Sequence, residues 1–342
     1  MKKFLIAVGL LLALGLLAGC AKEEPVEEVD PVEAAWSDFG DTYYALADED
    51  IEAKAALMEA FVREHPDTEY AGRLAGGIAY YRGESLGDPA AAYALLNETY
   101  GTNTDPETRF ELGKAMFPLA LELGEPADLD AIAQDLAASR ELDFGEMIDV
   151  ADLAVEHEQW ATGAKYAEAA LAKATPEAFL ADYPDDDYTP EEAAAKADRR
   201  KAMSYADLGW ALHNMGETDK AMAAFEAGAP LKTVDYLGVA DTSIDLYLGK
   251  VKLDAGDADG AITLLSPAAI MGSNDDAMAA LREAYATVKG NDDGIDEWMW
   301  SQREALGKPI DAFTLADYEG NEHDFSALSD GKVTLLAFWF PT

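Results

Sequence analysis

The chain has 342 residues, of which 67 are Asp or Glu and only 25 are Lys or Arg, so its formal net charge at pH 7 is −42. A surface of this sign repels phosphate backbones and anionic headgroups, which argues against a nucleic-acid partner and against membrane adhesion through a basic face. The hydrophobic residues make up 49% of the chain, enough to bury a sizeable core, and the length accommodates two domains.

Residues 1–19 read as a secretory signal peptide. Two lysines precede an apolar stretch, 4–17, that is too short to span a bilayer comfortably. The end of this stretch leads into the run Leu17, Ala18, Gly19 and Cys20. This run resembles the lipobox of bacterial lipoprotein signal peptides, which implies cleavage before Cys20 and lipid on its sulfur. A plain N-terminal membrane anchor with a chance cysteine is the alternative.

The lipobox resemblance implies a protein that is lipid-anchored in the bacterial cell envelope and faces the periplasm. Ala21, rather than Asp, follows the cysteine, which in lipoproteins favours the outer membrane over the inner. Several acyl chains together would hold the protein stably, at about 0.8 kcal/mol per buried methylene. Residues 20–36 are acidic and contain Pro, so we expect a tether. Cys20 is the only cysteine, which excludes an internal disulfide and a Cys-based metal site.

Residues 37–306 are predicted to form amphipathic helices in repeated hairpins. In the clearest unit, large and small apolar residues alternate at fixed spacing on two helices that meet at Gly216. Its packing residues are Tyr205, Leu208, Gly209, Leu212, Ala221, Phe225 and Gly228. The spacing resembles a tetratricopeptide repeat, in which small residues let two antiparallel helices approach while a large one, here Phe225, fills the space between them.

A second unit follows the first at an interval of 40 residues, from Leu208 to Leu248. Its packing residues are Leu248, Gly249, Gly256, Ala261, Leu265 and Ala268. The family period is nearer 34 residues, so the connection is stretched. Weaker matches to the repeat pattern occur at 158–172 and 110–126. The resemblance implies a solenoid that binds proteins; a generic helical bundle is the alternative.

Two short motifs in this region have a structural interpretation. Residues 257–265 contain the centre of a calcium loop, but Ala255 and Ser266 stand where two of its main ligands would be, so we expect a hairpin turn. The tripeptide that begins at His65 is expected to end a helix at Glu64, because Pro66 prevents its continuation. No metal site and no cofactor are predicted.

Residues 307–342 change character. The segment 313–317 alternates like a strand, 318–321 suits a turn, and 322–325 can return as the partner strand. The apolar run 333–338 suits a buried strand. The order of these parts resembles the opening of a redoxin domain, as in the TlpA-like membrane-tethered disulfide reductases and related peroxiredoxin-type proteins.

That family has a run of Gly, Pro, Phe, Leu, Asp and Gly, then Gly-Lys-Val, an apolar strand and Phe-Trp. The matching residues are Gly307, Ile310, Phe313, Leu315, Asp317, Gly320, Gly331, Lys332, Val333, Phe338 and Trp339. The proline of the family pattern corresponds to Pro309, so the spacing at the start of the motif differs slightly from that of the family. The sequence thus predicts a mainly α chain, a tetratricopeptide-like solenoid followed by an incomplete thioredoxin-like α/β segment.

In the family, three residues separate Phe-Trp from Cys-x-x-Cys, and Phe340, Pro341 and Thr342 stand in those places. The resemblance therefore implies that the catalytic nucleophile would follow Thr342. We expect the chain as printed to be inactive in dithiol exchange, although its parent would be a thiol–disulfide oxidoreductase. A selenocysteine codon read as stop, a frameshift and a fragmentary gene are left as alternatives, as is a non-catalytic lipid-anchored scaffold. Reductase, isomerase and peroxidase roles are not distinguished.

Overall fold

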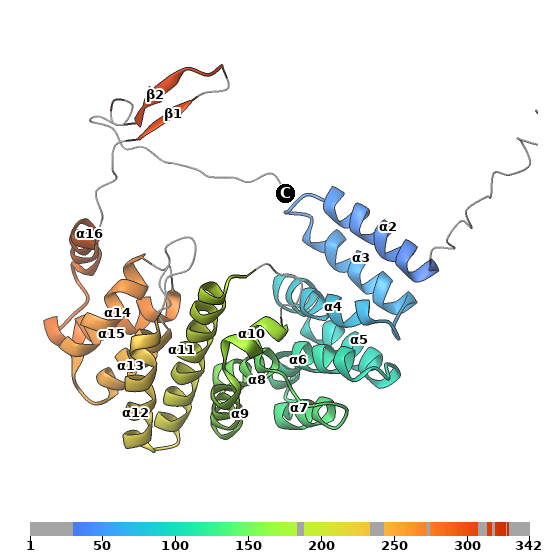
Figure 1. The fold of residues 1–342 in the computed structure, drawn as a ribbon, viewed down its shortest axis with the longest axis horizontal. Helices are drawn as coiled ribbons and strands as arrows, with labels where there is room; N and C mark the ends of the chain where they lie inside the picture. Colours follow the sequence, from blue (N-terminus) through green and yellow to red (C-terminus); the bar gives the residue numbers. More distant parts are fainter. Residues whose placement is uncertain are drawn as a thin grey trace, which may run out of the picture. The chain divides into compact units, whose positions relative to one another are not determined.

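The computed structural model describes residues 30–182, 188–232, 243–271, 274–306, 313–316, 319–325 and 327. The prediction of a mainly helical chain is confirmed, and the one sheet among these residues pairs two short strands (Figure 1). The helices are α2 (Pro31–Ala45), α3 (Ile51–Glu64), α4 (Glu69–Ile78), η1 (Ala79–Ser85, a π-helix), α5 (Pro89–Thr102), α6 (Pro106–Leu123), α7 (Leu129–Ala137), α8 (Phe144–Glu156), α9 (Trp160–Lys173), α10 (Pro176–Asp182), α11 (Pro190–Asn214), α12 (Thr218–Gly228), η2 (Ala229–Leu231, a 3₁₀-helix), α13 (Ser243–Asp254), α14 (Ala258–Met271), α15 (Asp275–Lys289) and α16 (Ile295–Leu306). The strands are β1 (Thr314–Ala316) and β2 (Glu322–Asp324).

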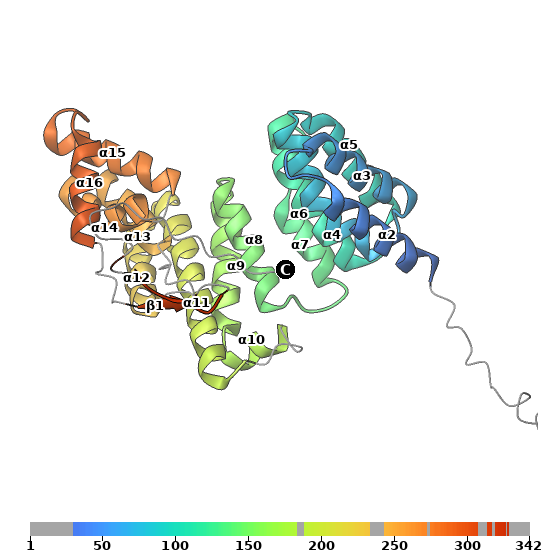
Figure 2. The same cartoon turned by 90° about the horizontal axis from the view of Figure 1, so that it is seen from above.

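The chain divides into two compact units. Among the described residues, unit 1 comprises 30–173 and 177–182, and unit 2 comprises 174–176 and those from 188 onward. Unit 1 therefore holds α2 to α9, whereas α11 to α16 and both strands fall in unit 2. Within each unit, many helices pack against a neighbour in the chain, such as α8 against α9 and α14 against α15, whereas α4 packs mainly against α6 (Figures 1 and 2).

Many helices begin at an acidic cap. The carboxylates of Asp88 and Asp105 accept hydrogen bonds from the backbone N–H groups of Ala91 and Thr108, and a proline follows each cap. The oxygen satisfies an N–H group that has no partner within the helix, and its charge faces the positive end of the helix dipole. Proline suits the next position because its missing N–H would have no partner there. Part of the acidic charge therefore serves to start helices.

In unit 2, glycines allow paired helices to approach closely. Phe225 of α12 is fully buried, and a Cβ added at Gly209 of α11 would lie 2.6 Å from its ring. In the next hairpin, a Cβ at Gly249 of α13 would lie 2.7 Å from Cγ of Leu265 in α14. No side chain fits at that distance, so both hairpins depend on glycine beside a large residue.

The turns of these two hairpins have the same conformation. Gly216 and Gly256 adopt left-handed φ values of +81° and +80°. After Gly216, the backbone N–H of Glu217 donates to the carbonyl oxygen of Leu212 at 2.9 Å, and the equivalent bond after Gly256 is 2.8 Å long. Such bonds satisfy carbonyl groups left unpaired at the end of a helix, at little steric cost when the left-handed residue is glycine.

The segment that contains the centre of a calcium loop is the second of these turns. Asp257 accepts a hydrogen bond from the backbone N–H of Gly260 at 3.0 Å and forms an ion pair with Lys252 at 2.7 Å. The Lys252 ammonium and the Gly260 N–H lower the pKa of the Asp257 carboxyl. Its oxygens are thus engaged in starting α14, as expected of a hairpin turn.

Unit 1 has the same close helix approaches with other partners. A Cβ at Gly163 of α9 would lie 2.7 Å from Val155 of α8, and one at Gly113 of α6 would lie 2.6 Å from Ile132 of α7. These pairs lie in or beside the weaker matches to the repeat pattern at 158–172 and 110–126. Both units are therefore built from helix pairs that need a residue without a side chain at the point of contact.

The turn between α8 and α9 differs from those of unit 2 in one respect. Glu158, with φ of +59°, is the one non-glycine residue with positive φ that the described part of the chain contains. The backbone N–H of Gln159 then donates to the carbonyl oxygen of Ala154 at 2.7 Å, as in the glycine turns. A left-handed residue with a Cβ costs about 1–2 kcal/mol, so this turn is strained.

Replacing Glu158 with Gly should raise the free energy of unfolding of unit 1 by about 1 kcal/mol, because the left-handed backbone would lose its steric penalty. Urea titration followed by circular dichroism measures this. The control is Gln159→Gly, at the next position but without positive φ, which should destabilise. Equal effects of the two glycines would contradict the assignment of strain to Glu158.

The N-terminal boundary of the helical region differs from the predicted one. Helix α2 begins at Pro31, with the Asp30 carboxylate as its cap, so residues 31–36 of the predicted tether are helical. The Trp36 ring stacks on Phe39, with centroids 5.0 Å apart, and on Tyr70, 4.3 Å apart. An Asp-Pro start signal followed by an aromatic anchor thus extends the first helix into the acidic segment. Residues 1–29, with the predicted signal peptide, lipobox and Cys20, lie outside the described residues.

The predicted hairpin near the C-terminus is present. Strands β1 and β2 are antiparallel, with Leu315 opposite His323. The backbone N–H of Phe325 donates to the carbonyl oxygen of Phe313 at 3.0 Å, and their rings stack with centroids 4.6 Å apart. Gly320 in the turn has φ of +85°, as a tight turn between strands requires. The predictions at Asp317, Phe338, Trp339 and Pro341 lie outside the described residues. None of the described helices is long and apolar enough to cross a membrane.

Candidate functional site

A groove in unit 1 runs over α4, α6 and α8. Helix α4 packs against α6, and the Lys114 ammonium of α6 lies 2.7 Å from the Asp149 carboxylate of α8. Two cavities of about 430 and 330 Å³ lie on these helices and share Glu111, and we call the surface that they form the acidic groove. The first is lined by Glu69, Gly72, Arg73, Asp105, Glu107, Thr108, Phe110, Glu111 and Glu146. The second is lined by Gly76, Glu111, Lys114, Ala115, Asp149, Asp152, Leu153 and Glu156.

The lining is dominated by carboxylates, eight in all against the two cations of Arg73 and Lys114. Not all of them are free to meet a ligand. The Asp105 carboxylate caps α6, accepting from the N–H and the hydroxyl of Thr108 at 2.8 and 2.7 Å. Glu69 pairs with Arg73 at 3.0 Å along α4. The charge that remains is concentrated on α8.

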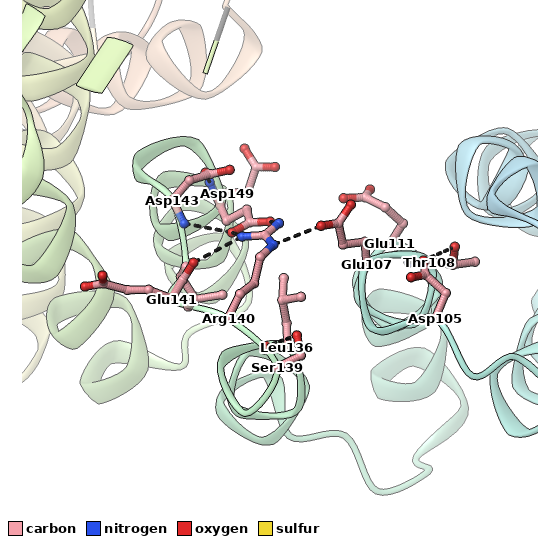
Figure 3. A network of polar contacts seen from close by, with 12 residues as sticks. Asp105, Glu107, Thr108, Glu111, Leu136, Ser139, Arg140, Glu141, Asp143 and Asp149 are labelled. Atoms are coloured by element: carbon pink, nitrogen blue, oxygen red, sulfur yellow. Dashed lines mark hydrogen bonds and ion pairs between the residues drawn. The ribbon is translucent and has the colours of Figure 1, made fainter. Parts of the chain in front are cut away.

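Arg140, in the loop between α7 and α8, fixes one end of the acidic groove. Its guanidinium donates to the Glu107 carboxylate at 2.9 Å (Figure 3). It also donates to both carboxylate oxygens of Glu146, at 2.6 and 3.0 Å. Glu146 also accepts from the backbone N–H of Asp143, completing a reciprocal cap at the start of α8. The Glu146 and Glu107 carboxylates raise the pKa of Arg140. The bidentate pair with Glu146 and the single bond to Glu107 together link the start of α8 to α6.

Lys114 stands between two carboxylates near the middle of the acidic groove. Its ammonium lies 2.9 Å from Glu111 and 2.7 Å from Asp149. Burial alone would lower the pKa of Lys114, but Asp149 and Glu111 raise it above its usual range. Lys114 is therefore occupied within the protein.

The carboxylates of Asp149, Asp152 and Glu156 form an acidic stripe on one face of α8, at intervals of three and four residues. Asp152 is exposed as a residue, yet its pKa is raised, because neighbouring atoms remove part of its hydration and because Glu156 and Asp149 repel its charge. Among the described residues, neither Asp152 nor Glu156 has a cationic partner. Like charges at this spacing destabilise a helix, so the stripe costs stability.

Replacing Asp152 with Asn should raise the melting temperature at pH 7 and leave it unchanged near pH 3. A carboxyl whose pKa is higher in the folded state binds protons more strongly there, so its ionisation lowers stability as pH rises above about 3.9, the ordinary Asp value. Below that value both forms are neutral. Thermal unfolding at the two pH values measures the effect, with Glu168→Asn as the control on α9. A gain of equal size at pH 3 would contradict the electrostatic origin.

The predicted repeat residues occupy the interiors of the hairpins. Fully buried side chains are those of Ala221, Phe225, Ala261 and Leu265, while Leu208 is buried and Tyr205 and Leu248 are half-buried. The Tyr205 Cβ would lie 2.7 Å from a Cβ added at Gly228, so this residue packs where α12 ends. The structure brings these residues together as packing groups of unit 2, whereas the acidic groove belongs to unit 1.

The residues of the acidic groove were not predicted as a group. Acidic residues are spread along the whole chain, and their gathering depends on which helices lie side by side. The intervals between Asp149, Asp152 and Glu156 were the available signal, because like charges on one helical face are unfavourable. No comparable signal linked Arg140 to Glu107, 33 residues away.

Comparisons with known proteins add little information about the function of this chain. No family model matches the chain, and no curated protein matches it. Among solved structures, the chain is similar to a tetratricopeptide repeat protein from Parabacteroides merdae, with 12% identity over 74% of this chain and 99% of that one. The TM-score is 0.33, a likeness too slight to carry an argument.

Proposed function

We propose that the helical repeats form a non-enzymatic scaffold that binds other proteins. We further propose that the acidic groove of unit 1 binds a basic, extended segment of a partner protein. The observation that carries this is the stripe of Asp149, Asp152 and Glu156, where charge that destabilises the free protein lines a cavity. Lys or Arg side chains of a partner would relieve the repulsion. Stability lost at a site is a common consequence of building it for binding.

The shape of the acidic groove suits an extended segment. Its two cavities adjoin along α4, α6 and α8, so successive side chains of one peptide can reach both. The ion pairs of Arg140 and Lys114 hold the helices in place before a partner arrives, which reduces the cost of ordering the site. The resemblance to tetratricopeptide repeats supports the same conclusion, since such repeats generally mediate protein interactions.

The test uses a peptide of alternating Lys and Ser and its Glu counterpart, titrated against the full chain. The double variant Asp152→Asn with Glu156→Gln should bind the Lys peptide about three- to tenfold more weakly, as expected for the loss of two exposed ion pairs. The matched control, Glu98→Gln with Glu168→Gln, removes the same charge from exposed positions on α5 and α9. Equal loss in both double variants would show attraction by net charge alone and would refute the site.

We also propose that Cys20 carries the lipid that fixes this scaffold to the cell envelope, facing the periplasm and favouring the outer membrane. The proposal rests on the run from Leu17 to Cys20 after a short apolar stretch. Because the surface is acidic, attachment through lipid is consistent with a protein that anionic headgroups would otherwise repel.

A second candidate function is thiol–disulfide exchange by a redoxin domain to which residues 307–342 would belong. The specific observation in its favour is the antiparallel pairing of β1 and β2, with the stacked rings of Phe313 and Phe325 next to it in the chain, in the order that the family's opening implies. In that family, the first cysteine lies at a helix N-terminus, where the dipole lowers the thiol pKa and activates it for attack on a disulfide.

Insulin reduction tests the redoxin candidate. The chain as printed should be inactive, since its one cysteine is Cys20. A version continued through the reading frame downstream of codon 342, with Cys at the expected nucleophile position, should reduce insulin and lose that activity when this Cys is replaced by Ser. A folded but inert continued protein, or downstream DNA that encodes no Cys-x-x-Cys in frame, would refute the candidate and leave the scaffold.

A further inference from the structure

A second groove lies in unit 2, over α11, α13 and α15. It encloses about 310 Å³ and differs in chemistry from the acidic groove, because an aromatic ring and small apolar side chains form much of its lining. We call it the aromatic groove. The residues that line it are Trp210, Lys250, Leu253, Asp254, Asp276, Ala279, Ala280 and Glu283.

The indole of Trp210 is held in place by its neighbours. The Tyr247 ring stacks on it with centroids 5.3 Å apart and planes 4° from parallel, and the His213 ring stacks at 5.5 Å. His213 is itself fixed, because its Nε2–H donates to the Asp254 carboxylate at 3.0 Å. A large aromatic side chain that is already ordered loses little entropy on binding and makes an effective anchor in an interface.

The charges around the aromatic groove are unequally satisfied. Asp254 accepts from His213, and Asp276 lies 2.9 Å from the Lys250 ammonium. Glu283, exposed on α15, forms no ion pair with any described residue. The aromatic groove therefore presents an apolar floor of Leu253 and Ala279 beside one carboxylate without a cation.

We infer that the aromatic groove binds an extended segment of another protein that carries an apolar side chain next to a basic one. The apolar side chain would lie against Trp210 and the floor of the groove, where removal of its apolar surface from water is favourable. The basic side chain would reach Glu283, whose charge complements it. This site is in unit 2 and its chemistry differs from that of the acidic groove. The two proposed sites can therefore be tested independently.

Four short peptides test the inference, each capped at both ends and containing a central pair, Leu-Lys, Leu-Glu, Ser-Lys or Ser-Glu, between Gly and Ser. Binding to the full chain is followed by the indole NMR signal of Trp210, identified from its absence in Trp210→Phe. The Leu-Lys peptide should move this signal and bind most tightly. Glu283→Gln should weaken it about threefold, the effect of one exposed ion pair, and leave Leu-Glu binding no weaker.

Ala279→Trp should abolish the response, because Ala279 is exposed and a large ring there would fill the groove without disturbing the core. The matched controls are Ala223→Trp and Glu226→Gln, at exposed positions on α12, which should bind as the parent does. The inference is overturned if the Trp210 signal does not respond, if Ser-Lys binds as tightly as Leu-Lys, or if the controls lose binding equally. The variants Asp152→Asn and Glu156→Gln should leave this binding unchanged, which separates it from the acidic groove.

Discussion

Replacing Phe225 with Ala should lower the free energy of unfolding of unit 2 by about 3–5 kcal/mol. Phe225 is fully buried and its ring fills the space opposite Gly209. Removing the ring gives up its burial and leaves a cavity that α11 and α12 cannot readily close. Since a domain is stable by only about 5–15 kcal/mol, this change consumes a large part of the total.

Hydrogen exchange measured by mass spectrometry gives the sharpest readout. Peptides from α11 and α12 should lose protection in the variant, while peptides from α6 in unit 1 serve as an internal reference. Phe225→Leu should cost less than Phe225→Ala, because it leaves a smaller cavity and because Leu265 fills the equivalent place in the next hairpin. Unchanged protection in Phe225→Ala would refute the role of this ring as the packing residue of the hairpin.

The same pair offers a second check on the geometry. Gly209→Ala alone should destabilise, since its Cβ would meet the Phe225 ring at 2.6 Å. In the background of Phe225→Ala, that methyl group has room and should cost much less. A double-mutant cycle with no coupling between the two positions would contradict their contact.

Replacing Cys20 with Ser should transfer the protein from the membrane fraction to the soluble fraction. On the proposed function, the acyl chains on Cys20 provide the attachment to the membrane. Fractionation with immunoblotting measures the change, and incorporation of a labelled fatty acid by the parent, but not by Cys20→Ser, identifies the lipid. The control is Lys22→Ala, which leaves the run from Leu17 to Cys20 intact. An unlabelled parent protein would exclude the lipoprotein interpretation.

The parts of the fold that could be predicted are those specified by local chemistry. Gly216 and Gly256 mark hairpin turns because glycine adopts a left-handed φ without strain. The Phe313 to Phe325 segment shows its hairpin through alternation and a turn glycine. The turn at Glu158 could not be predicted in the same way, since a glutamate there carries no signal for positive φ.

The sites depend on which helices meet, and for that reason they escaped prediction. In the sequence, Trp210 has the pattern of an ordinary core residue on an amphipathic helix. Only the structure shows that Tyr247 and Leu253 of α13 lie beside it. The acidic groove likewise requires α6 and α8 to be joined through Lys114 and Asp149. Single-sequence patterns report on contacts a few positions apart, whereas these contacts join residues 35 or more positions apart.

The equivalence of the two glycine turns in unit 2 has a consequence for how such a chain can change in length. Leu208 and Leu248, and likewise Gly216 and Gly256, are separated by the same 40 residues. Each hairpin closes on itself and presents a similar face to the next, so most contacts are made with immediate neighbours. A gene duplication that inserts one whole period would therefore add a helix pair without rebuilding the others. Growth by whole modules would lengthen the aromatic groove in steps, and with it the stretch of the partner segment that we infer to bind there.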